Sequence, residues 1–263
     1  MSITALFELL AAITAIIGAV FLFDQQLHRP RPYKLMWTLG LLFYGIAAAA
    51  AFAGAAGEWT VASYKVWYFF GGILTAAYLG FGTLYLLGPR RLAHVVAIVG
   101  GIISIYALIR IVSFPVSAAT ASHIAASTTA QVTDVSHFKV LPVDMEVAAI
   151  VMNIPGSILL FGGALYSAWR FIRSRTQAYR VVSMVFIAGG ALLLSVTTGL
   201  QRLGYSDLAA FGEFAGALCL IGGMLVSHDV FSVFRIPFTS IVVHARKINS
   251  EAPQASLPSH ATD

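Results

Sequence analysis

The most regular feature of the chain is a succession of continuous apolar runs, separated by short breaks that carry polar residues, Pro or Gly. A helix needs about 20 apolar residues to cross a bilayer, and seven runs reach roughly that length. They have no two-residue alternation, so they are typical of helices and not of barrel strands. The predicted spans are 5–23, 35–53, 66–88, 93–115, 145–169, 181–199 and 208–230. The pattern predicts an all-α, multi-pass bundle of seven transmembrane helices over residues 1–230.

Three segments fall outside the predicted spans. Residues 116–144, rich in Ser, Thr and Ala, are expected to form an outer loop. Residues 231–248 mix apolar and basic side chains, which is typical of an amphipathic segment at the membrane interface. Residues 249–263 have the composition of a disordered cytoplasmic tail. None of these segments is long enough to hold a soluble signalling domain.

Basic residues orient the bundle, because cytoplasmic loops carry an excess of Lys and Arg. Those predicted on one side are Arg29, Arg31, Lys34, Arg90, Arg91, Arg170, Arg173, Arg175, Arg180, Arg235, Arg246 and Lys247. The opposite side receives Lys65, Lys139 and Arg202, and Arg110 lies inside a span. We therefore expect a cell-membrane protein with its N-terminus outside and its C-terminus in the cytoplasm.

The composition excludes an ordinary soluble domain. Charged residues make up 10% of the chain, against about 25% in soluble domains. The net charge of +5 does not indicate a nucleic-acid partner, because the 16 basic residues are divided among short loops and form no aromatic-lined stripe. A single cysteine, Cys219, excludes an intrachain disulfide and a Cys-rich metal site.

Ionisable residues inside spans are the first candidates for function, because burying a charge in a membrane is costly. Glu8, Arg110, Glu146 and Glu213 all fall in the outer part of their predicted spans. Arg110 and Glu213 are predicted at similar depth, which favours an ion pair. That pair would either hold the bundle together or form part of a polar ligand site.

Further polar residues are predicted in the same half. Asn153 stands two residues before Pro155, which removes a backbone donor and frees the carbonyl of Val151. This kink would either form a binding shelf or serve packing alone. Tyr106 and Gln201 complete the candidate ligand-binding set. The outer half of the bundle is thus expected to be polar and the inner half apolar.

Two further patterns concern helix packing and internal symmetry. The glycines expected to let helices approach closely are Gly80, Gly82, Gly189, Gly190, Gly212 and Gly216. Tyr33-Lys34 and Tyr179-Arg180 occupy similar places in the second and sixth spans. The spacing indicates either a 3+1+3 repeat, as in some transporters, or the ordinary preference of Tyr and basic residues for helix ends.

Catalytic and cofactor chemistry finds little support. His94 and His228 lie at the inner boundary and would have to come together from two helices to ligate a haem, so no cofactor and no metal are expected. The chain contains no Gly-x-Ser-x-Gly and no phosphate-binding Gly-x-x-x-x-Gly-Lys-Ser/Thr. Nothing in the sequence indicates an enzyme.

Three functions remain open. The leading hypothesis is a ligand-binding or sensor-like bundle with an outward-facing polar pocket, and a sensor would need a separate cytoplasmic partner at the basic inner loops. The second is a secondary transporter of a small solute, proton-coupled through Glu8 or Glu213, which the repeat favours and an apolar inner half opposes. The third is a structural or assembly subunit of a membrane complex.

Overall fold

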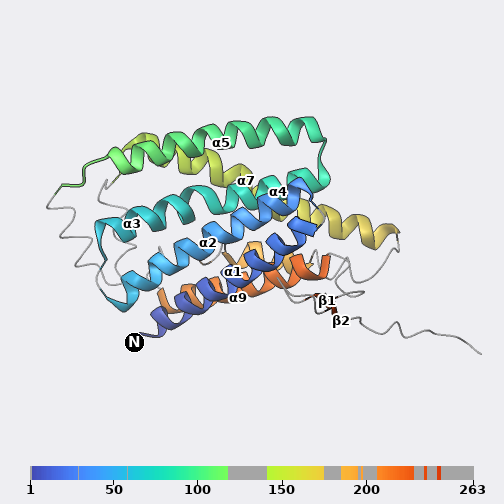
Figure 1. The fold of residues 1–263 in the computed structure, drawn as a ribbon, viewed down its shortest axis with the longest axis horizontal. Helices are drawn as coiled ribbons and strands as arrows, with labels where there is room; N and C mark the ends of the chain where they lie inside the picture. The colour runs from blue at the N-terminus through green and yellow to red at the C-terminus, as the bar shows by residue number, and fades with distance from the viewer. Residues whose placement is uncertain are drawn as a thin grey trace, which may run out of the picture.

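The computed structural model describes residues 2–28, 30–57, 59–117, 141–174, 185–194, 197, 206–227, 234–235 and 242–243. Over this part the chain is almost entirely helical (Figure 1). The long helices are α1 (Ile3–His28), α2 (Pro32–Ala56), α5 (Arg90–Ser113), α7 (Val143–Ser174) and α9 (Ser206–Ser227). A further continuous helical stretch is built from α3 (Val61–Trp67), η1 (Tyr68–Thr75) and α4 (Ala76–Leu87).

In the described part of the chain, five helical stretches are long and apolar enough to cross a membrane. They are Ile3–His28, Pro32–Ala56, Val61–Leu87, Arg90–Ser113 and Val143–Ser167, and they contain or closely overlap the first five predicted spans. Most of these helices are longer than the predicted spans, because the helical hydrogen bonds continue into the polar residues that flank each apolar run. The predicted sixth span is described as the short apolar helix Val185–Leu194 and residue 197, and the seventh overlaps α9.

From α1 to α7 the successive helical stretches run in alternating directions, with α3, η1 and α4 counted as one stretch (Figure 1). The beginning of α1 meets the end of α2 where the Ser2 hydroxyl donates to the carbonyl of Ala55, at 3.4 Å. At the same end, Nζ of Lys65 in α3 donates to the carbonyl of Phe114 just after α5, at 2.7 Å. We call this the N-terminal end of the bundle, and the other the opposite end.

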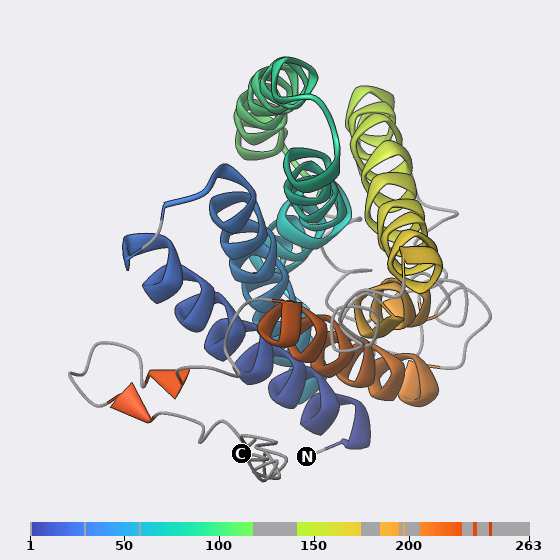
Figure 2. The same cartoon turned by 90° about the vertical axis from the view of Figure 1, so that its right-hand side faces the viewer.

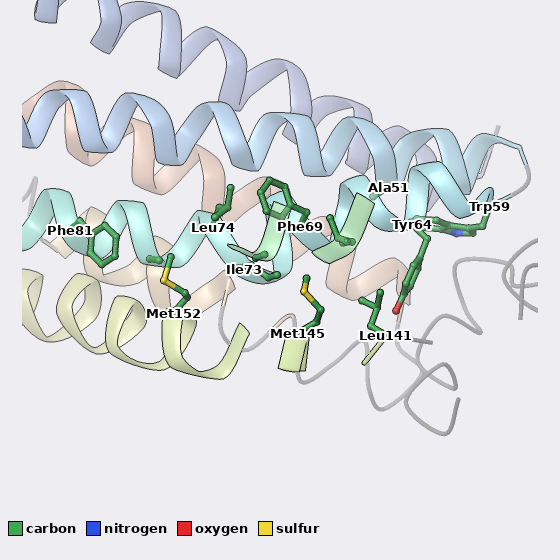
Figure 3. Close-up of a cluster of buried hydrophobic side chains, with 13 residues drawn as sticks. Ala51, Trp59, Tyr64, Phe69, Ile73, Leu74, Phe81, Leu141, Met145 and Met152 are labelled. Carbon is green, nitrogen blue, oxygen red and sulfur yellow. The ribbon is translucent and has the colours of Figure 1, made fainter. Parts of the chain in front are cut away.

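Three clusters of buried side chains hold the helices together. One lies towards the N-terminal end, where Met145 and Met152 of α7 point towards Ile73 and Leu74 of η1 (Figure 3). A second joins Trp37 of α2 to α1, α4, α7, α9 and the helix Val185–Leu194. The third is small: Ala11, Ala12 and Ala15 of α1, Tyr44 and Ala48 of α2, and Ala217 of α9. Alanine predominates there, so α1, α2 and α9 pack closely.

Glycines mark the closest helix contacts, as the sequence predicts. A Cβ added to Gly80 in α4 would collide with the carbonyl oxygen of Gly156 in α7. A Cβ added to Gly190 would lie 2.7 Å from the carbonyl oxygen of Gly216 in α9. These positions need glycine because another backbone occupies the space of a side chain.

The predicted span 66–88 is interrupted by the π-helix η1, which the apolar pattern does not indicate. A π-helix accommodates one extra residue per turn and leaves some backbone groups without their usual partners. Within η1 the Thr75 hydroxyl donates to the carbonyl of Phe70, five residues earlier, at 2.8 Å. This side chain supplies one of the hydrogen bonds that the widened turn requires.

The helical elements confirm the all-α expectation, and a short ladder lies in the predicted amphipathic segment 231–248. Strands β1 (Phe234–Arg235) and β2 (Val242–Val243) form a short antiparallel ladder, with Phe234 opposite Val243. Aromatic and β-branched residues favour this extended conformation. Most of the predicted outer loop 116–144, the remainder of the segment 231–248 and the tail 249–263 lie outside the described residues.

Candidate functional site

Arg110 pairs with Asp144, and the expected ion pair with Glu213 is wrong. Nε of Arg110 lies 2.7 Å from Oδ2 of Asp144, and Nη2 lies 3.3 Å from Oδ1. The end-on view places α5, which carries Arg110, and α9, which carries Glu213, on opposite sides of the bundle (Figure 2). Depth along the membrane normal was predicted to be similar for the two residues, but depth does not determine which helices are neighbours.

Asp144 was missed because the sequence analysis assigned it to the loop 116–144, whereas α7 begins at Val143. The hydroxyl of Tyr106 also donates to Oδ2 of Asp144, at 2.6 Å. Two donors from α5 therefore hold one carboxylate at the start of α7. Both side chains of the ion pair are about one third exposed, so the arrangement is suited to joining two helices near a surface.

Asn153 has a partner on another helix. Its Nδ2 donates a hydrogen bond to the backbone carbonyl of Gly72 in η1. The candidate ligand shelf at Asn153 therefore faces the π-helix, and its amide supplies a donor where that helix departs from α geometry. The apolar pattern does not indicate η1, so this partner could not be predicted from it.

Glu8 is the most deeply buried carboxyl group of the candidate set. It is 2% exposed, and its Oε2 atom is buried without a hydrogen-bond partner among the described residues. Its helix packs against α2 and α9 through the alanine-rich cluster. Burying a carboxylate oxygen without a donor is costly, so Glu8 is poorly explained as a packing residue.

The carboxyl of Glu213 lies close enough to Glu8 for electrostatic interaction, and both interact with the buried hydroxyl of Tyr44. That hydroxyl donates to the backbone carbonyl of Glu213, at 3.1 Å, which links α2 to α9. The structure thus brings together two candidates, Glu8 and Glu213, and adds Tyr44, which the sequence analysis did not select. We call these three residues the carboxyl site.

Two further sets of contacts join α1 to α9 near the carboxyl site. Towards the beginning of the helices, the Thr4 hydroxyl donates to Oδ1 of Asp207 and joins α1 to the start of α9. Phe7 packs edge-on against Phe211 and stacks with Phe214, with ring centroids 5.3 and 6.2 Å apart. Both polar and aromatic contacts therefore hold α1 against α9 at this end of the bundle.

The remaining candidates do not converge on this site. Glu146, which is exposed, lies within electrostatic reach of the hydroxyls of Tyr64 and Tyr68. Gln201 and His228 lie outside the described residues. His94 is exposed, and its Nδ1 lies 2.6 Å from the carbonyl of Arg90 in the same helix. The structure divides the candidate set among separate locations.

The opposite half of the bundle is not apolar, contrary to expectation. Asp24 and Lys34, near the junction of α1 and α2, are 6% and 5% exposed, and the buried hydroxyls of Thr38 and Ser167 lack hydrogen-bond partners among the described residues. The Lys34 ammonium lies 3.4 Å from the carbonyl of Gln25. Asp24 and Lys34 fall between the first two predicted spans, and Thr38 and Ser167 fall inside predicted spans. A one-dimensional pattern does not show which of their side chains face inward.

In the part of the chain that the structure describes, no three His, Cys, Asp or Glu side chains form a group that could hold a metal ion. The carboxyl site has a different chemistry, since two carboxyl groups and one phenol can hold a proton or complement one small cationic group. Comparison with protein-family models, with curated proteins and with solved structures found no match for this chain.

Proposed function

We propose that the chain is a seven-helix cell-membrane protein that binds a small cation from the outside at the carboxyl site. The observation that carries this proposal is the buried Oε2 atom of Glu8, which has no hydrogen-bond partner among the described residues. An ionisable group inside a membrane segment is a candidate for function, because its burial is costly unless it serves a purpose. A bound cation would supply the interaction that this oxygen lacks.

Membrane insertion is supported by the outward surface of α5. Val95, Ile98, Ile102, Ile105 and Ile109 are each more than half exposed. An apolar surface of this extent suits contact with lipid, whereas in water it favours aggregation. In our proposal the predicted segment 181–199 forms the sixth membrane span and α9 forms the seventh. At 22 residues, α9 is about 33 Å long, enough for a hydrocarbon core of about 30 Å.

The proposed orientation puts the carboxyl site near the outer surface. Glu8 lies in the second turn of α1, and the basic loops place the beginning of α1 outside. A cation would then reach the site from the exterior. The carboxyl groups would attract it, while the surrounding phenyl rings would limit the size of ligand that fits.

A thermal-shift assay on the purified protein tests the proposal. The probes are sodium, potassium, choline and putrescine chlorides at matched ionic strength. We expect at least one to raise the Tm of the wild type and to lose this effect in Glu8→Gln. Glu146→Gln is the matched control, because Glu146 is an exposed carboxyl group at the same end of the bundle, and it is expected to respond like the wild type. An equal response in Glu8→Gln contradicts the proposal, as does the absence of any response.

A secondary transporter is the second candidate, and the buried polar side chains of the opposite half favour it. Transport needs polar groups along a path to both sides of the membrane. Asp24, Lys34, Thr38 and Ser167 are such groups, so the objection raised by an apolar inner half no longer applies. Uptake of the stabilising cation into proteoliposomes would support transport, and binding without uptake would support a receptor.

A receptor of this kind would act through a separate cytoplasmic partner. In the proposed topology the connections after the first, third and fifth spans carry basic residues on the inner face. Their charge favours an acidic partner surface. Pull-down of acidic proteins that is lost when Arg90 and Arg91 are both replaced by Gln would support this arrangement.

A further inference from the structure

We propose that the Glu8 side chain holds an exchangeable proton when no other cation is bound, so that cation binding at the carboxyl site releases this proton. The part of this inference that concerns cation binding rests on the proposed function. The proton itself requires no ligand and is observable in the empty protein. Competition between this proton and the cation would make cation occupancy of the carboxyl site depend on the proton concentration outside the membrane.

One oxygen of the Glu8 carboxyl group lacks a hydrogen-bond donor among the described residues. An ionised carboxylate presents two oxygens that both need hydrogen bonds or a cation. Among the described residues, Oε2 of Glu8 has no hydrogen-bond partner. A proton on this oxygen removes the charge and leaves a neutral group, which is far cheaper to bury in apolar surroundings.

The helices α2 and α9, which pack against α1, carry the titratable groups near Glu8. From α2 comes Tyr44, whose hydroxyl hydrogen is directed at the backbone carbonyl of Glu213. From α9 comes the carboxyl of Glu213. Asp207 of the same helix accepts from Thr4, which lies one turn before Glu8 in α1. In the described chain no Lys or Arg side chain forms an ion pair with Glu8.

Exchange of the proton for a monovalent cation keeps the net charge of the site unchanged. Loss of the proton from the Glu8 carboxyl leaves a carboxylate, and a monovalent cation that replaces it restores the original net charge. The O–H bond of Glu8 breaks, the proton passes to water at the outer surface, and no oxidation or reduction takes place. The neighbouring Glu213 disfavours a second, uncompensated negative charge, so release of the proton and entry of the cation are expected to occur together.

Infrared spectroscopy of the full-length protein in lipid nanodiscs tests the proton directly. A protonated carboxyl group has a C=O stretching band that a carboxylate lacks, and the band shifts when the proton is exchanged for deuterium. We expect a deuterium-sensitive band at neutral pH that is absent from Glu8→Gln and retained in Glu146→Gln. Identical bands in the wild type and Glu8→Gln, or no such band in either protein, would overturn the proposal.

A second measurement separates this proposal from the proposed function. In weakly buffered solution with a pH indicator, addition of the stabilising cation is expected to release about one proton per cation bound in the wild type. Glu146→Gln should behave in the same way. Cation binding without proton release would overturn the proton inference and leave the binding site intact. A carboxyl band in a protein that binds none of the four cations would overturn the proposed function and leave the proton in place.

Discussion

The side-chain amide of Asn153 in α7 donates a hydrogen bond to the backbone carbonyl of Gly72 in the middle of η1. Two irregularities of the chain, a proline-containing helix and a π-helix, therefore meet at one contact. Just beyond this contact, α4 continues from η1 and approaches α7 backbone to backbone at Gly80 and Gly156. The hydrogen bond thus fixes the alignment of two helices whose close packing leaves little room for adjustment.

Replacing Asn153 by Ala is expected to destabilise the protein by about 1 kcal/mol, because hydrogen bonds between membrane helices contribute roughly this amount. The loss should be concentrated in η1. Hydrogen–deuterium exchange is therefore expected to accelerate over residues 68–75 and to change little in α1. Ser157→Ala, one turn further along α7, serves as a control. Unchanged exchange in η1 would show that the contact does not stabilise the π-helix.

The contact between Arg110 and Asp144 predicts an energetic coupling between these residues. In a double-mutant cycle with alanine, we expect the combined loss of stability to be smaller than the sum of the single losses, by about 0.5 to 1 kcal/mol, as for partly exposed ion pairs. The corresponding cycle with Arg110 and Glu213 should be additive. The opposite result, coupling to Glu213 and none to Asp144, would contradict the observed pairing.

Close packing of α4 on α7 predicts different outcomes for glycines of the same helix. Gly156→Ala places a methyl group on the backbone of Ala76, so we expect a loss of about 1 to 3 kcal/mol, typical of overpacking. Gly162→Ala is the matched control, because nothing lies within 4 Å of its added Cβ, and alanine favours helix there. Thermal unfolding in detergent measures both. Equal Tm values for the two variants would be inconsistent with the close approach.

Removal of the Tyr44 hydroxyl is expected to loosen α9 from α2. Tyr44→Phe keeps the ring in the alanine-rich cluster and loses the bond to the Glu213 carbonyl, at a cost of about 1 kcal/mol. The variant should still hold a proton on Glu8, since that hydroxyl does not donate to it. Thermal unfolding measures the loss of stability, and the infrared carboxyl band measures the proton on Glu8. Loss of the band in Tyr44→Phe would show that the proton depends on the Tyr44 hydroxyl.

Much of the helical framework could be predicted, because apolar runs of span length and a few glycines carry that information locally. The pairing of Arg110 with Asp144 could not, since the sequence places residues by depth and not by the neighbour across a helix interface. The π-helix was missed because Tyr68–Thr75 continues the apolar run without interruption. Glu8 and Glu213 were predicted only to share the outer layer, and the structure brings these two carboxyl groups into electrostatic reach of each other. The contact of Tyr44 with α9 depends on how α2 packs, which no local pattern reveals.

The most direct test of the membrane arrangement is labelling of single cysteines in intact cells with a membrane-impermeant maleimide. Cys219→Ser provides the cysteine-free background, and cysteine then replaces Ser117, beyond the end of α5, or Arg173, near the end of α7. We predict that the cysteine at 117 reacts from outside and that the cysteine at 173 reacts only after the cells are permeabilised. Reaction at 173 in intact cells would contradict the proposed topology and, with it, access of cations to Glu8 from the exterior.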